Sequence, residues 1–353
     1  MKEHIVITGA SGLVGRALLA RYLDQGCPVI ALCRKPPALP SNPLMSWHWA
    51  DVSLPRLGLD PATYAEVCSK ARLVFHLAAR TDFKDATAAS YLPVNLGGVK
   101  HALALAQEAN APLHQVSTAF VCGDWPGEFR EADLDLGQHF RNGYEESKFM
   151  GESFLHGAMT ASASVPITIY RPGIVVERNP SAASGKTFGP FLFLDAVARL
   201  RDSAEAKGLA ELPALRVLGN RAAYLPLVFD DAVAEALVRL AAKPASGGQV
   251  FQLVAPEPVG NVLLEEAFNE AFGQPAAHFA GVEEFKGQPA NPLEALLARK
   301  TTPYAVYLDL SVRFTRHNLD TLAGPETLPT PNRAELAQAF RAFLAARSQR
   351  SAP

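Results

Sequence analysis

The sequence predicts an α/β protein built on a parallel, doubly wound sheet, and two observations lead to that fold class. From residue 4 to about 172, short β-branched runs alternate with Ala- and Leu-rich helical stretches, which is the pattern of repeated strand–helix–strand units. The strand runs also carry little polar alternation, as expected for strands that helices cover on both faces. A longer, mostly helical region follows.

The predicted elements can be placed in order along the chain. The strand runs are HIVITG, PVIAL, LVFHLAA, APLHQVSTAFV and PITIYRP, and the helical stretches between them cover 12–25, 90–109 and 143–160. Gly26 follows the first helix, where a left-handed cap would sit. After Pro172 come the loop ERNPSAASGKTFGP, the helical FLFLDAVARLRDSAEA, strand and helix at 223–242, a strand at 249–254, and helices near 261–272, 291–299 and 333–347.

This change of rhythm predicts two regions that are discontinuous in sequence. Residues 1–176, with 223–254 returning to them, are expected to form the sheet domain. Residues 177–222 and 255–353 are expected to form a smaller, mostly helical region that binds substrate. A chain of 353 residues is long enough for both.

Composition excludes several classes of function. The formal net charge is -2 and no run of Lys or Arg offers a footprint for nucleic acid. Charges or prolines interrupt every apolar stretch before a membrane span is reached, and MKEHIVITGA lacks the long apolar core of a signal peptide. The four cysteines form no CxxC and no His cluster joins them, which predicts reduced thiols, no metal site and a cytoplasmic protein; they are Cys27, Cys33, Cys68 and Cys122.

Three glycines between the first strand and the first helix predict a dinucleotide site. In ITGASGLVGRALLARYLDQG, Gly9 would make the tight turn, Gly12 would let a pyrophosphate approach the backbone, and Gly15 would let helix pack on strand. The intervening turn and first helical residues are expected to contact the cofactor as well; they are Ser11, Leu13 and Val14. A turn whose glycines serve backbone geometry alone is the alternative.

The end of the second strand favours NADP over NAD. Where a carboxylate would hold the ribose 2′-hydroxyl, this chain has Cys33, Arg34 and Lys35, and Arg34 favours a 2′-phosphate. Arg16 can reach the same phosphate, although a surface arginine at a helix start is the alternative. Asp51, with Val52 beside it, follows the third strand and could meet the adenine amine, or Asp51 could simply cap a loop. These residues make the sheet domain a predicted NADP-binding domain.

SGKT at 184–187 looks like the end of a phosphate-binding P-loop. That motif needs a glycine five residues before Gly185, and the residue there is Pro180. It is therefore discounted.

The stretch NGYEESKFMGE sets Tyr144 four residues before Lys148, on one face of a helix. A phenol placed against a carbonyl oxygen can protonate it when hydride arrives at the carbon. A free tyrosine, with a pKa of about 10, holds its proton too tightly, and a nearby ammonium would lower that pKa. The spacing alone is a weak indication, because chance can produce it.

Taken together, the glycine triplet, QVSTAFVCG and YEESK resemble the extended short-chain dehydrogenase/reductases, which have a Rossmann-type fold. The resemblance implies that Thr118, with Ser117 before it, binds the substrate carbonyl and that Tyr144 and Lys148 form the catalytic pair. Both are also expected to contact the cofactor, with the Lys148 ammonium holding the nicotinamide ribose. It implies that Asn95 supports the lysine through a water. It further implies cofactor contacts at the sixth strand's end and along HLAAR, from Pro172 and Ile174 and from Leu77, Ala78 and Ala79.

A narrower resemblance lies within that family. WADVSLPRLGLDPATYAEVCSKARLVFHLAARTDF, the acidic EFREADLD and PGIVVERNPSAASGKTFGP resemble the thioester-reductase and fatty acyl-CoA reductase branch. The resemblance implies NADPH-dependent reduction of an acyl thioester to aldehyde or alcohol. Branch members are often fused to a carrier domain, and no carrier-type Asp-Ser-Leu is found here, so the acyl group is expected on coenzyme A or a separate acyl carrier protein.

Two alternatives stay open. One is an extended reductase of the same family that acts on a ketone, an aldehyde or a nucleotide sugar. The other is an NADP-binding sensor without catalysis, although such proteins generally lack the tyrosine–lysine pair that is intact here. Many family members dimerise through two core helices, so the sequence leaves monomer and homodimer open.

Overall fold

The computed structural model describes residues 3–38, 40–83, 85–161, 164–181, 189–206, 208 and 213–351. The SGKT segment at 184–187 lies outside these described residues. By their contacts the residues divide into two compact units. Unit 1 comprises Met1–Gly173, Asp230–Val254 and Val312–Leu328, and unit 2 comprises Ile174–Phe229, Ala255–Ser311 and Pro329–Pro353.

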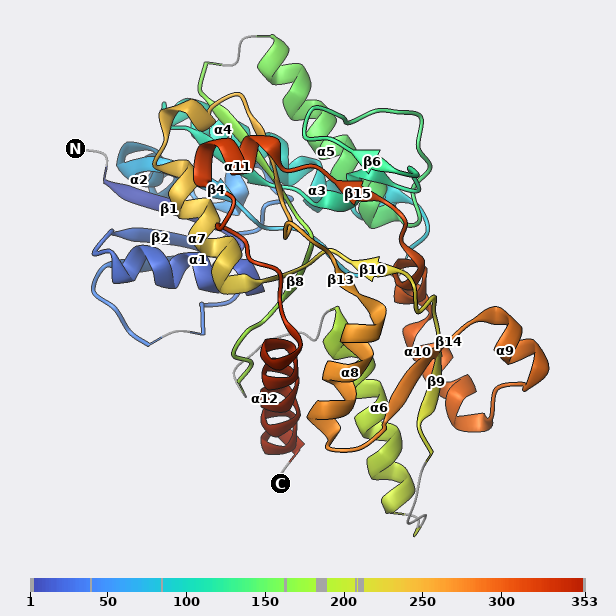
Figure 1. Cartoon of the computed structure of the whole chain (residues 1–353). Coiled ribbons are helices and arrows are strands. Elements are labelled where there is room, and N and C mark those ends of the chain that lie inside the picture. Colours follow the sequence, from blue (N-terminus) through green and yellow to red (C-terminus); the bar gives the residue numbers. More distant parts are fainter. Residues whose placement is uncertain are drawn as a thin grey trace. The chain divides into compact units, whose positions relative to one another are not determined.

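Unit 1 is built on a seven-stranded sheet in which every pairing is parallel, in the order β12-β7-β5-β4-β1-β2-β3 (Figure 1). This confirms the predicted fold class. The strands are β1 His4–Thr8, β2 Val29–Cys33, β3 Met45–Trp49, β4 Ala71–His76, β5 Leu113–Val116, β7 Ile167–Pro172 and β12 Val250–Leu253.

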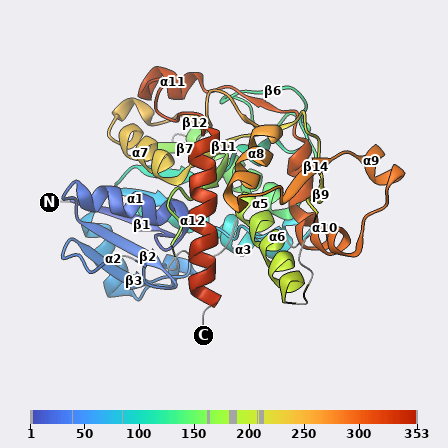
Figure 2. The ribbon, with the colours of Figure 1, turned by 60° about the horizontal axis from the view of Figure 1, so that its bottom comes forward.

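Helices cover both faces of this sheet. On one face α2 (Pro61–Lys70), α4 (Gly97–Glu108) and α5 (Gly143–Thr160) bury apolar side chains against the strands in one continuous core. On the other face α1 (Leu13–Asp24) packs beside α7 (Asp230–Ala241), as Figures 1 and 2 both show. The strands are therefore enclosed on both sides, which explains their nearly continuous apolar sequences.

Unit 1 also contains the segment 312–328, which the sequence placed with the C-terminal region. Its strand β15 (Arg313–Phe314) pairs with β6 (Glu128–Phe129), and its helix α11 (His317–Ala323) packs on β12. The shorter elements of unit 1 are η1 Pro55–Gly58, η2 Ala88–Ser90, α3 Leu92–Asn95, η3 Ala119–Cys122 and η4 Pro244–Ser246.

Unit 2 is mostly helical, with three two-stranded pairs among its described residues. Helix α12 packs against α8 and α6, and α10 packs against α6 and β9. Its elements are β8 Ile174–Val176, α6 Pro190–Glu205, β9 Leu215–Leu218, β10 Tyr224–Leu225, β11 Leu227–Phe229, β13 Val259–Gly260, α8 Asn261–Phe272, β14 Ala277–Ala280, α9 Val282–Gly287, α10 Pro292–Ala305, η5 Val306–Asp309 and α12 Arg333–Ser351.

The strand order puts β1 between β2 and β4, so the direction of sheet growth reverses there. In open α/β sheets ligands bind outside the carboxyl ends of the strands at such a reversal.

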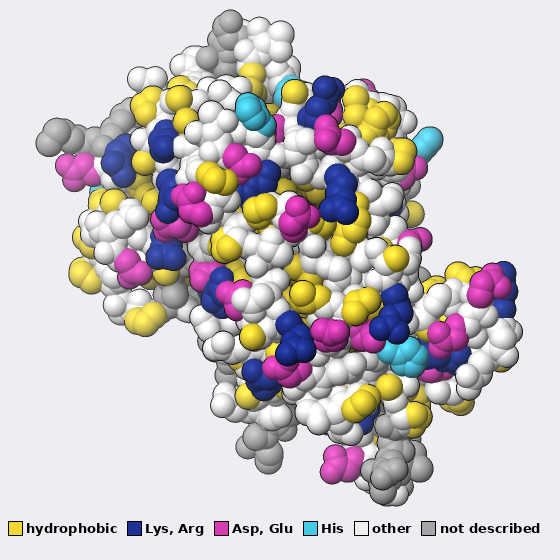
Figure 3. Space-filling model, in the orientation of Figure 1, with side chains coloured by type: hydrophobic (Ala, Val, Ile, Leu, Met, Phe, Trp, Pro, Cys, Tyr) yellow, Lys and Arg dark blue, Asp and Glu magenta, His cyan; other side chains and the backbone are white. Residues whose placement is uncertain are grey.

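Among the described residues, none of the helices has the length and apolar character required to cross a membrane. The described part of the chain contains no cluster of metal-ligating side chains, and basic and acidic side chains are interspersed on the face drawn in Figure 3.

Candidate active site

The turn after β1 is closed by glycines that the surrounding backbone requires. Gly9 has φ +71°, and a Cβ on it would lie 2.6 Å from the backbone nitrogen of Ala78. A Cβ on Gly15 would collide with the carbonyl oxygen of Gly9. Gly9 therefore lies in a tight turn, and Gly15 packs closely on that turn; the roles of the three glycines toward a cofactor stay predictions.

Gly12 is the N-cap of α1 and offers no side-chain bond to the first N–H groups of that helix. A Cβ on Gly12 would have one neighbour within 4 Å, the Gly9 carbonyl oxygen at 3.2 Å, so the space there is more open than at Gly9. Ser11, Leu13 and Val14 lie half-buried around this turn. Open backbone at a helix N-terminus is the kind of cradle that a pyrophosphate fits.

Arg34 is exposed directly after β2, where the cofactor choice was predicted. Asp51 accepts hydrogen bonds from the Ser53 hydroxyl at 2.6 Å and the Ser53 amide at 3.0 Å. These bonds hold the pKa of Asp51 below its usual value, and the charge of Arg34 adds to that effect. Val52 is buried and its carbonyl accepts from His101 Nδ1 at 2.9 Å, while Arg16 donates to the carbonyl of Ser11 at 3.1 Å.

The segment 77–79 runs against the end of β1. The hydroxyl of Thr8 contacts His76 Nδ1 at 2.7 Å and accepts from the backbone N–H of Leu77 at 3.2 Å and of Ala78 at 3.4 Å. Burial lowers the pKa of His76 to about 3, so its ring is neutral. The predicted cofactor residues Leu77, Ala78 and Ala79 thus lie next to the glycine turn.

The catalytic residues converge where β5 ends and α5 begins. Asn142 caps α5 by accepting from the N–H of Glu145 at 3.0 Å. Tyr144 makes a side-chain hydrogen bond with Thr118, the first residue after the β5–Ser117 stretch. One helical turn on, Lys148 is buried and its Nζ donates to the carbonyl of Val116 at 2.8 Å.

Burial governs the protonation of this pair. It raises the pKa of Tyr144 to about 12, against the opposing hydrogen bond from Thr118. It lowers the pKa of Lys148 to about 8, against the opposing charge of Glu152. The shift of the phenol pKa comes from desolvation, opposed by the Thr118 hydrogen bond, and not from the charge of Lys148 as expected, so Tyr144 stands as a protonated phenol at neutral pH.

Asn95 lies at the centre of a different set of bonds from the one expected. Its amide accepts from the backbone N–H of Arg80 at 2.8 Å and donates to the carbonyl of Arg80 at 3.1 Å and to the hydroxyl of Ser147 at 2.8 Å. The Ser147 hydroxyl in turn donates to the carbonyl of Tyr144 at 2.8 Å. The water-mediated support of Lys148 stays a prediction.

The two residues predicted to lie near the nicotinamide are found at the end of β7 and at the start of β8. Pro172 is the last residue of β7, and the following N–H of Gly173 donates to the carbonyl of Leu253 at 3.1 Å. Ile174 begins β8, and its N–H donates to the carbonyl of Pro226 at 2.8 Å. Their contact with a cofactor stays a prediction.

Sequence reasoning missed three residues near the pair, of which Glu152 acts on Lys148 through its charge. Glu152 is fully buried in an ion pair with Arg171 at 2.6 Å and stands one turn after Lys148, a spacing that could have revealed it. Ser147 links Asn95 to Tyr144, and the ring of Phe83 lies 5.3 Å from that of Tyr144. Nothing in the local sequence distinguishes Ser147 or Phe83 from ordinary polar and apolar residues.

Known proteins share both sequence and fold with this chain. Residues 42–201 match an NAD-binding family model described as Male sterility protein. The hybrid PKS-NRPS synthetase mpsA of Macrophomina phaseolina is 31% identical over 246 residues, which cover 66% of this chain and 6% of that protein. The chain thus spans a small fraction of the curated relatives it matches.

Two solved structures share the fold. The terminal R domain from the myxalamid PKS-NRPS biosynthetic pathway has a TM-score of 0.76 at 21% identity, covering 99% of this chain and 92% of that one. A thiolation-reductase di-domain from an archaeal non-ribosomal peptide synthetase has a TM-score of 0.71 at 17% identity, covering 99% of this chain and 76% of that one. At these identities the likeness is one of fold.

Proposed function

We propose that this chain is a member of the thioester-reductase branch of the extended short-chain dehydrogenase/reductases and that it reduces an acyl thioester with NADPH; the family match over residues 42–201 and the similarity to a hybrid PKS-NRPS synthetase support this. The observation that carries the proposal is the convergence of Thr118, Tyr144 and Lys148 at the sheet edge that also holds the glycine turn. Such a site can bind a carbonyl oxygen, protonate it and face a bound dinucleotide.

The residues of the chain have separate parts in this chemistry. NADPH, held by the residues of the glycine turn, would supply a hydride to the carbonyl carbon. The Thr118 hydroxyl and the Tyr144 phenol bind the carbonyl oxygen, and the phenol gives its proton to that oxygen. The carbon–sulfur bond then breaks, the proton on the oxygen passes to the departing sulfur, and the products are an aldehyde and a free thiol; the Tyr144 phenolate regains a proton from solvent. The aldehyde can enter a second round that yields the alcohol.

The similarity to these relatives supports a carrier-borne acyl group as the proposed substrate. The matched proteins are named as polyketide and non-ribosomal peptide synthetases, and one structure joins a reductase to a thiolation domain. We therefore propose an acyl group on a phosphopantetheine thiol, presented by a carrier protein or by coenzyme A.

Substitution of Tyr144 tests the reaction. Tyr144→Phe removes the proton donor and should lower thioester-dependent NADPH oxidation by roughly 10²–10⁴-fold, while NADPH affinity changes little. The measurement is NADPH oxidation and thiol release with acyl-CoAs, acyl carrier thioesters, aldehydes, ketones and nucleotide sugars. Tyr64→Phe is the matched control, because that phenol bonds Glu108 on the surface of α4 and takes no part in the site.

Other outcomes have clear meanings. Turnover with aldehydes or ketones but no thioester would move the protein to the general carbonyl reductases of the same family. NADPH binding without turnover on any of these substrates would favour the sensor. Equal thioester reduction by Tyr144→Phe and the unsubstituted protein would contradict the assigned proton donor.

Substitution of Arg34 tests the cofactor. Arg34→Ala removes the exposed guanidinium at the end of β2 and should weaken NADPH binding about tenfold, as the loss of one charge-assisted contact to phosphate would. NADH lacks the 2′-phosphate, so its affinity serves as the internal control and should not change. Equal losses for the two cofactors would show that Arg34 does not select between them.

A further inference from the structure

The segment that follows β4 is folded onto the N-terminus of α5, directly beside the catalytic tyrosine. The N–H of Gly143 donates to the carbonyl of Asp85 at 3.1 Å, and the N–H of Ala88 donates to Glu146 Oε2 at 2.9 Å. A Cβ on Gly143 would collide with the carbonyl oxygen of Thr87. No side chain fits between the two segments, so the loop and the start of α5 behave as one packed piece.

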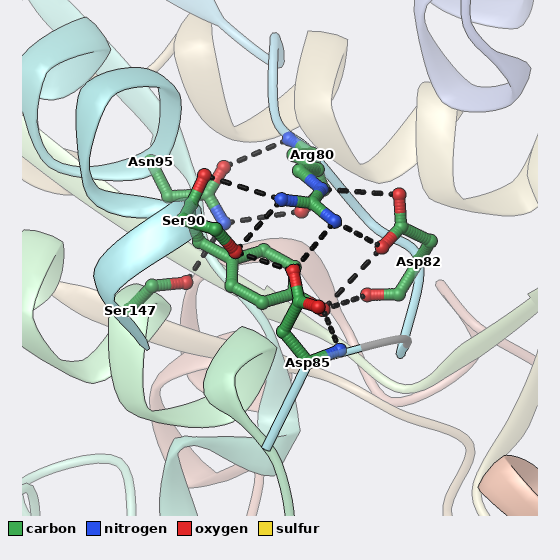
Figure 4. A network of polar contacts seen from close by, with 7 residues as sticks. Arg80, Asp82, Asp85, Ser90, Asn95 and Ser147 are labelled. Carbon is green, nitrogen blue, oxygen red and sulfur yellow. Dashed lines mark hydrogen bonds and ion pairs between the residues drawn. The ribbon is translucent and has the colours of Figure 1, made fainter. Parts of the chain in front are cut away.

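Arg80 holds this loop together from within (Figure 4). Its guanidinium donates to both carboxylate oxygens of Asp82, at 3.0 and 3.1 Å, and to Asp85 at 2.9 Å. The remaining terminal nitrogen donates to the hydroxyl of Ser90 at 2.8 Å and to its carbonyl at 3.2 Å. A forked guanidinium can bind two carboxylates and a turn at once, which a lysine ammonium cannot do with the same geometry.

The backbone of Arg80 is anchored to the catalytic helix as well. The Asn95 side chain accepts a hydrogen bond from the N–H of Arg80 and donates to the carbonyl of Arg80 and to the hydroxyl of Ser147. The Ser147 hydroxyl in turn donates to the carbonyl of Tyr144. The ring of Tyr91 lies 4.3 Å below the guanidinium. Its hydroxyl donates to the carbonyl of Asp82 at 2.8 Å and accepts from the N–H of Asp85 at 3.2 Å.

The outcome of these bonds is the placement of Phe83, between the two aspartates. Its half-buried ring stands 5.3 Å from the ring of Tyr144 at an interplanar angle of 42°. Thr118 hydrogen-bonds the Tyr144 side chain, so the phenol has a polar neighbour in Thr118 and an apolar one in Phe83. An aromatic ring beside the phenol excludes water from it and offers apolar surface to whatever the phenol binds.

We infer that Arg80 is a positioning residue that holds Phe83 against Tyr144, and that Phe83 forms the apolar wall against which the first carbons of the acyl group lie. This rests on the proposed function in one respect, because the acyl group is the proposed substrate. The placement of Phe83 by Arg80 is a property of the protein alone. Among the described residues, the charged groups near this pair include Asp82, Asp85 and Arg80 from the loop and Glu145, Glu146 and Lys148 from α5.

The test compares four substitutions in the full chain. Arg80→Lys keeps the charge and loses the fork, Tyr91→Phe keeps the ring and loses the two bonds to the loop, Phe83→Leu removes the aromatic wall, and Phe83→Tyr keeps it. Arg130→Lys is the matched control, because Arg130 binds the carboxylate of Asp133 in the same forked manner. Thermal melts establish that each variant is folded.

The first measurement needs no substrate. In protein carrying ring-labelled tyrosine, the resonance of Tyr144, assigned by its loss in Tyr144→Phe, carries the ring-current shift of Phe83. Arg80→Lys and Tyr91→Phe should move that resonance toward its position in Phe83→Leu, and Phe83→Tyr and Arg130→Lys should leave it near its original place. An unmoved resonance in Arg80→Lys would overturn the positioning role, whether or not the protein reduces thioesters.

The second measurement is steady-state reduction of acetyl-CoA and octanoyl-CoA. Arg80→Lys should lower kcat by roughly 10–100-fold, as small misplacements of catalytic groups do, with the affinity for NADPH unchanged. Phe83→Leu should raise KM for octanoyl-CoA more than for acetyl-CoA. Phe83→Tyr, which keeps an aromatic ring at this position, should leave both KM values near those of the unsubstituted protein. Equal KM changes for both substrates would overturn the acyl wall, and absence of any reduction by the unsubstituted protein would refute the proposed function while the resonance still decides the placement.

Discussion

Desolvation moves the pKa values of Tyr144 and Lys148 in opposite directions, upward for the phenol and downward for the amine. A buried phenol keeps its proton to about pH 12 and a buried amine gives up its proton near pH 8. Both shifts favour the neutral forms. Tyr144 therefore keeps its proton at neutral pH, while Lys148, with a pKa of about 8, is still mostly charged there.

Substitution of Lys148 should expose the cost of burying it. Its folded pKa, about 8, lies below the ordinary 10.5, so the unfolded chain binds more protons and this group lowers stability at all pH values below 8. Lys148→Met should raise the free energy of unfolding at pH 7 by about 1–2 kcal/mol, after the lost bond to Val116 is deducted. Activity should fall at the same time.

The gain in stability should depend on pH with a defined sign. It should shrink as pH rises from 8 to 10.5, because the lysine of the unsubstituted protein then becomes neutral in both states. Denaturant unfolding at several pH values gives the measurement. Lys70→Met is the control on the exposed end of α2 and should stay within about 0.5 kcal/mol; a pH-independent difference for Lys148→Met would contradict the assigned burial cost.

At the scale of elements, the turn between β1 and α1 is held in place because its backbone packs closely against the backbone of the segment after β4. Gly9 faces the nitrogen of Ala78, which lies in the segment after β4, so the turn and that segment close on each other. The helix start is left without a side-chain cap at Gly12. The N–H of Gly12 donates to the carbonyl of Gly9 at 2.9 Å, and we expect the N–H groups of the first turn of α1 to be the donors for an anion.

Gly9 and Gly26 have the same backbone angle, so comparing their substitutions separates the cost of backbone strain from the cost of a steric clash. Gly9 and Gly26 both have φ +71°, but a Cβ on Gly26 would meet nothing within 4 Å. Gly26→Ala should therefore cost about 1 kcal/mol, the price of the left-handed backbone alone. Gly9→Ala should cost at least 2 kcal/mol more and abolish NADPH binding, as measured by denaturant unfolding and cofactor titration; equal costs would show that the contact with Ala78 does not matter.

At the scale of the whole molecule, unit 1 is assembled from segments far apart in the chain, and one carboxylate joins three of them. Glu131 Oε1 accepts from the N–H groups of Gln252 and Leu319, at 3.1 and 3.3 Å, and Oε2 accepts from the N–H of Asn318 at 2.6 Å. It thus caps α11 and ties it to β12. Burial raises the pKa of Glu131 in spite of these bonds.

Replacement of that carboxylate should loosen the return of 312–328 to the sheet. Glu131→Gln keeps the shape but turns one acceptor into a donor, so at least one buried N–H loses its partner, at a cost of about 1–3 kcal/mol. Amide exchange should speed up at Asn318 relative to the strands of the sheet. Glu128→Gln, on the exposed side of β6, should change neither quantity; unchanged exchange in Glu131→Gln would mean that other contacts hold the segment.

The sequence predicted the parts of the fold and site that depend on local pattern. Strands enclosed by helices are mostly apolar, so β1, β2, β4, β5 and β7 can be recognised as apolar runs in the sequence, and the sheet confirms the fold class. The glycine spacing and the tyrosine–lysine spacing are legible for the same reason, since each is set by one turn or one helix face. The assigned roles of the site residues stay predictions.

Tertiary structure decided everything that depends on which distant segments meet. Phe83 lies on Tyr144, Asn95 bonds Arg80 and Ser147, and 312–328 joins unit 1, because chain segments separated by tens to hundreds of residues pack against one another. The shifted pKa values belong here too, because desolvation is a property of the assembled core. The sequence by itself determined the strand–helix order, the glycine turn and the YxxxK pair, because periodicity and backbone geometry act between near neighbours. Only the tertiary structure decided how deeply that pair is buried, how close its neighbours lie and which hydrogen bonds hold it in place.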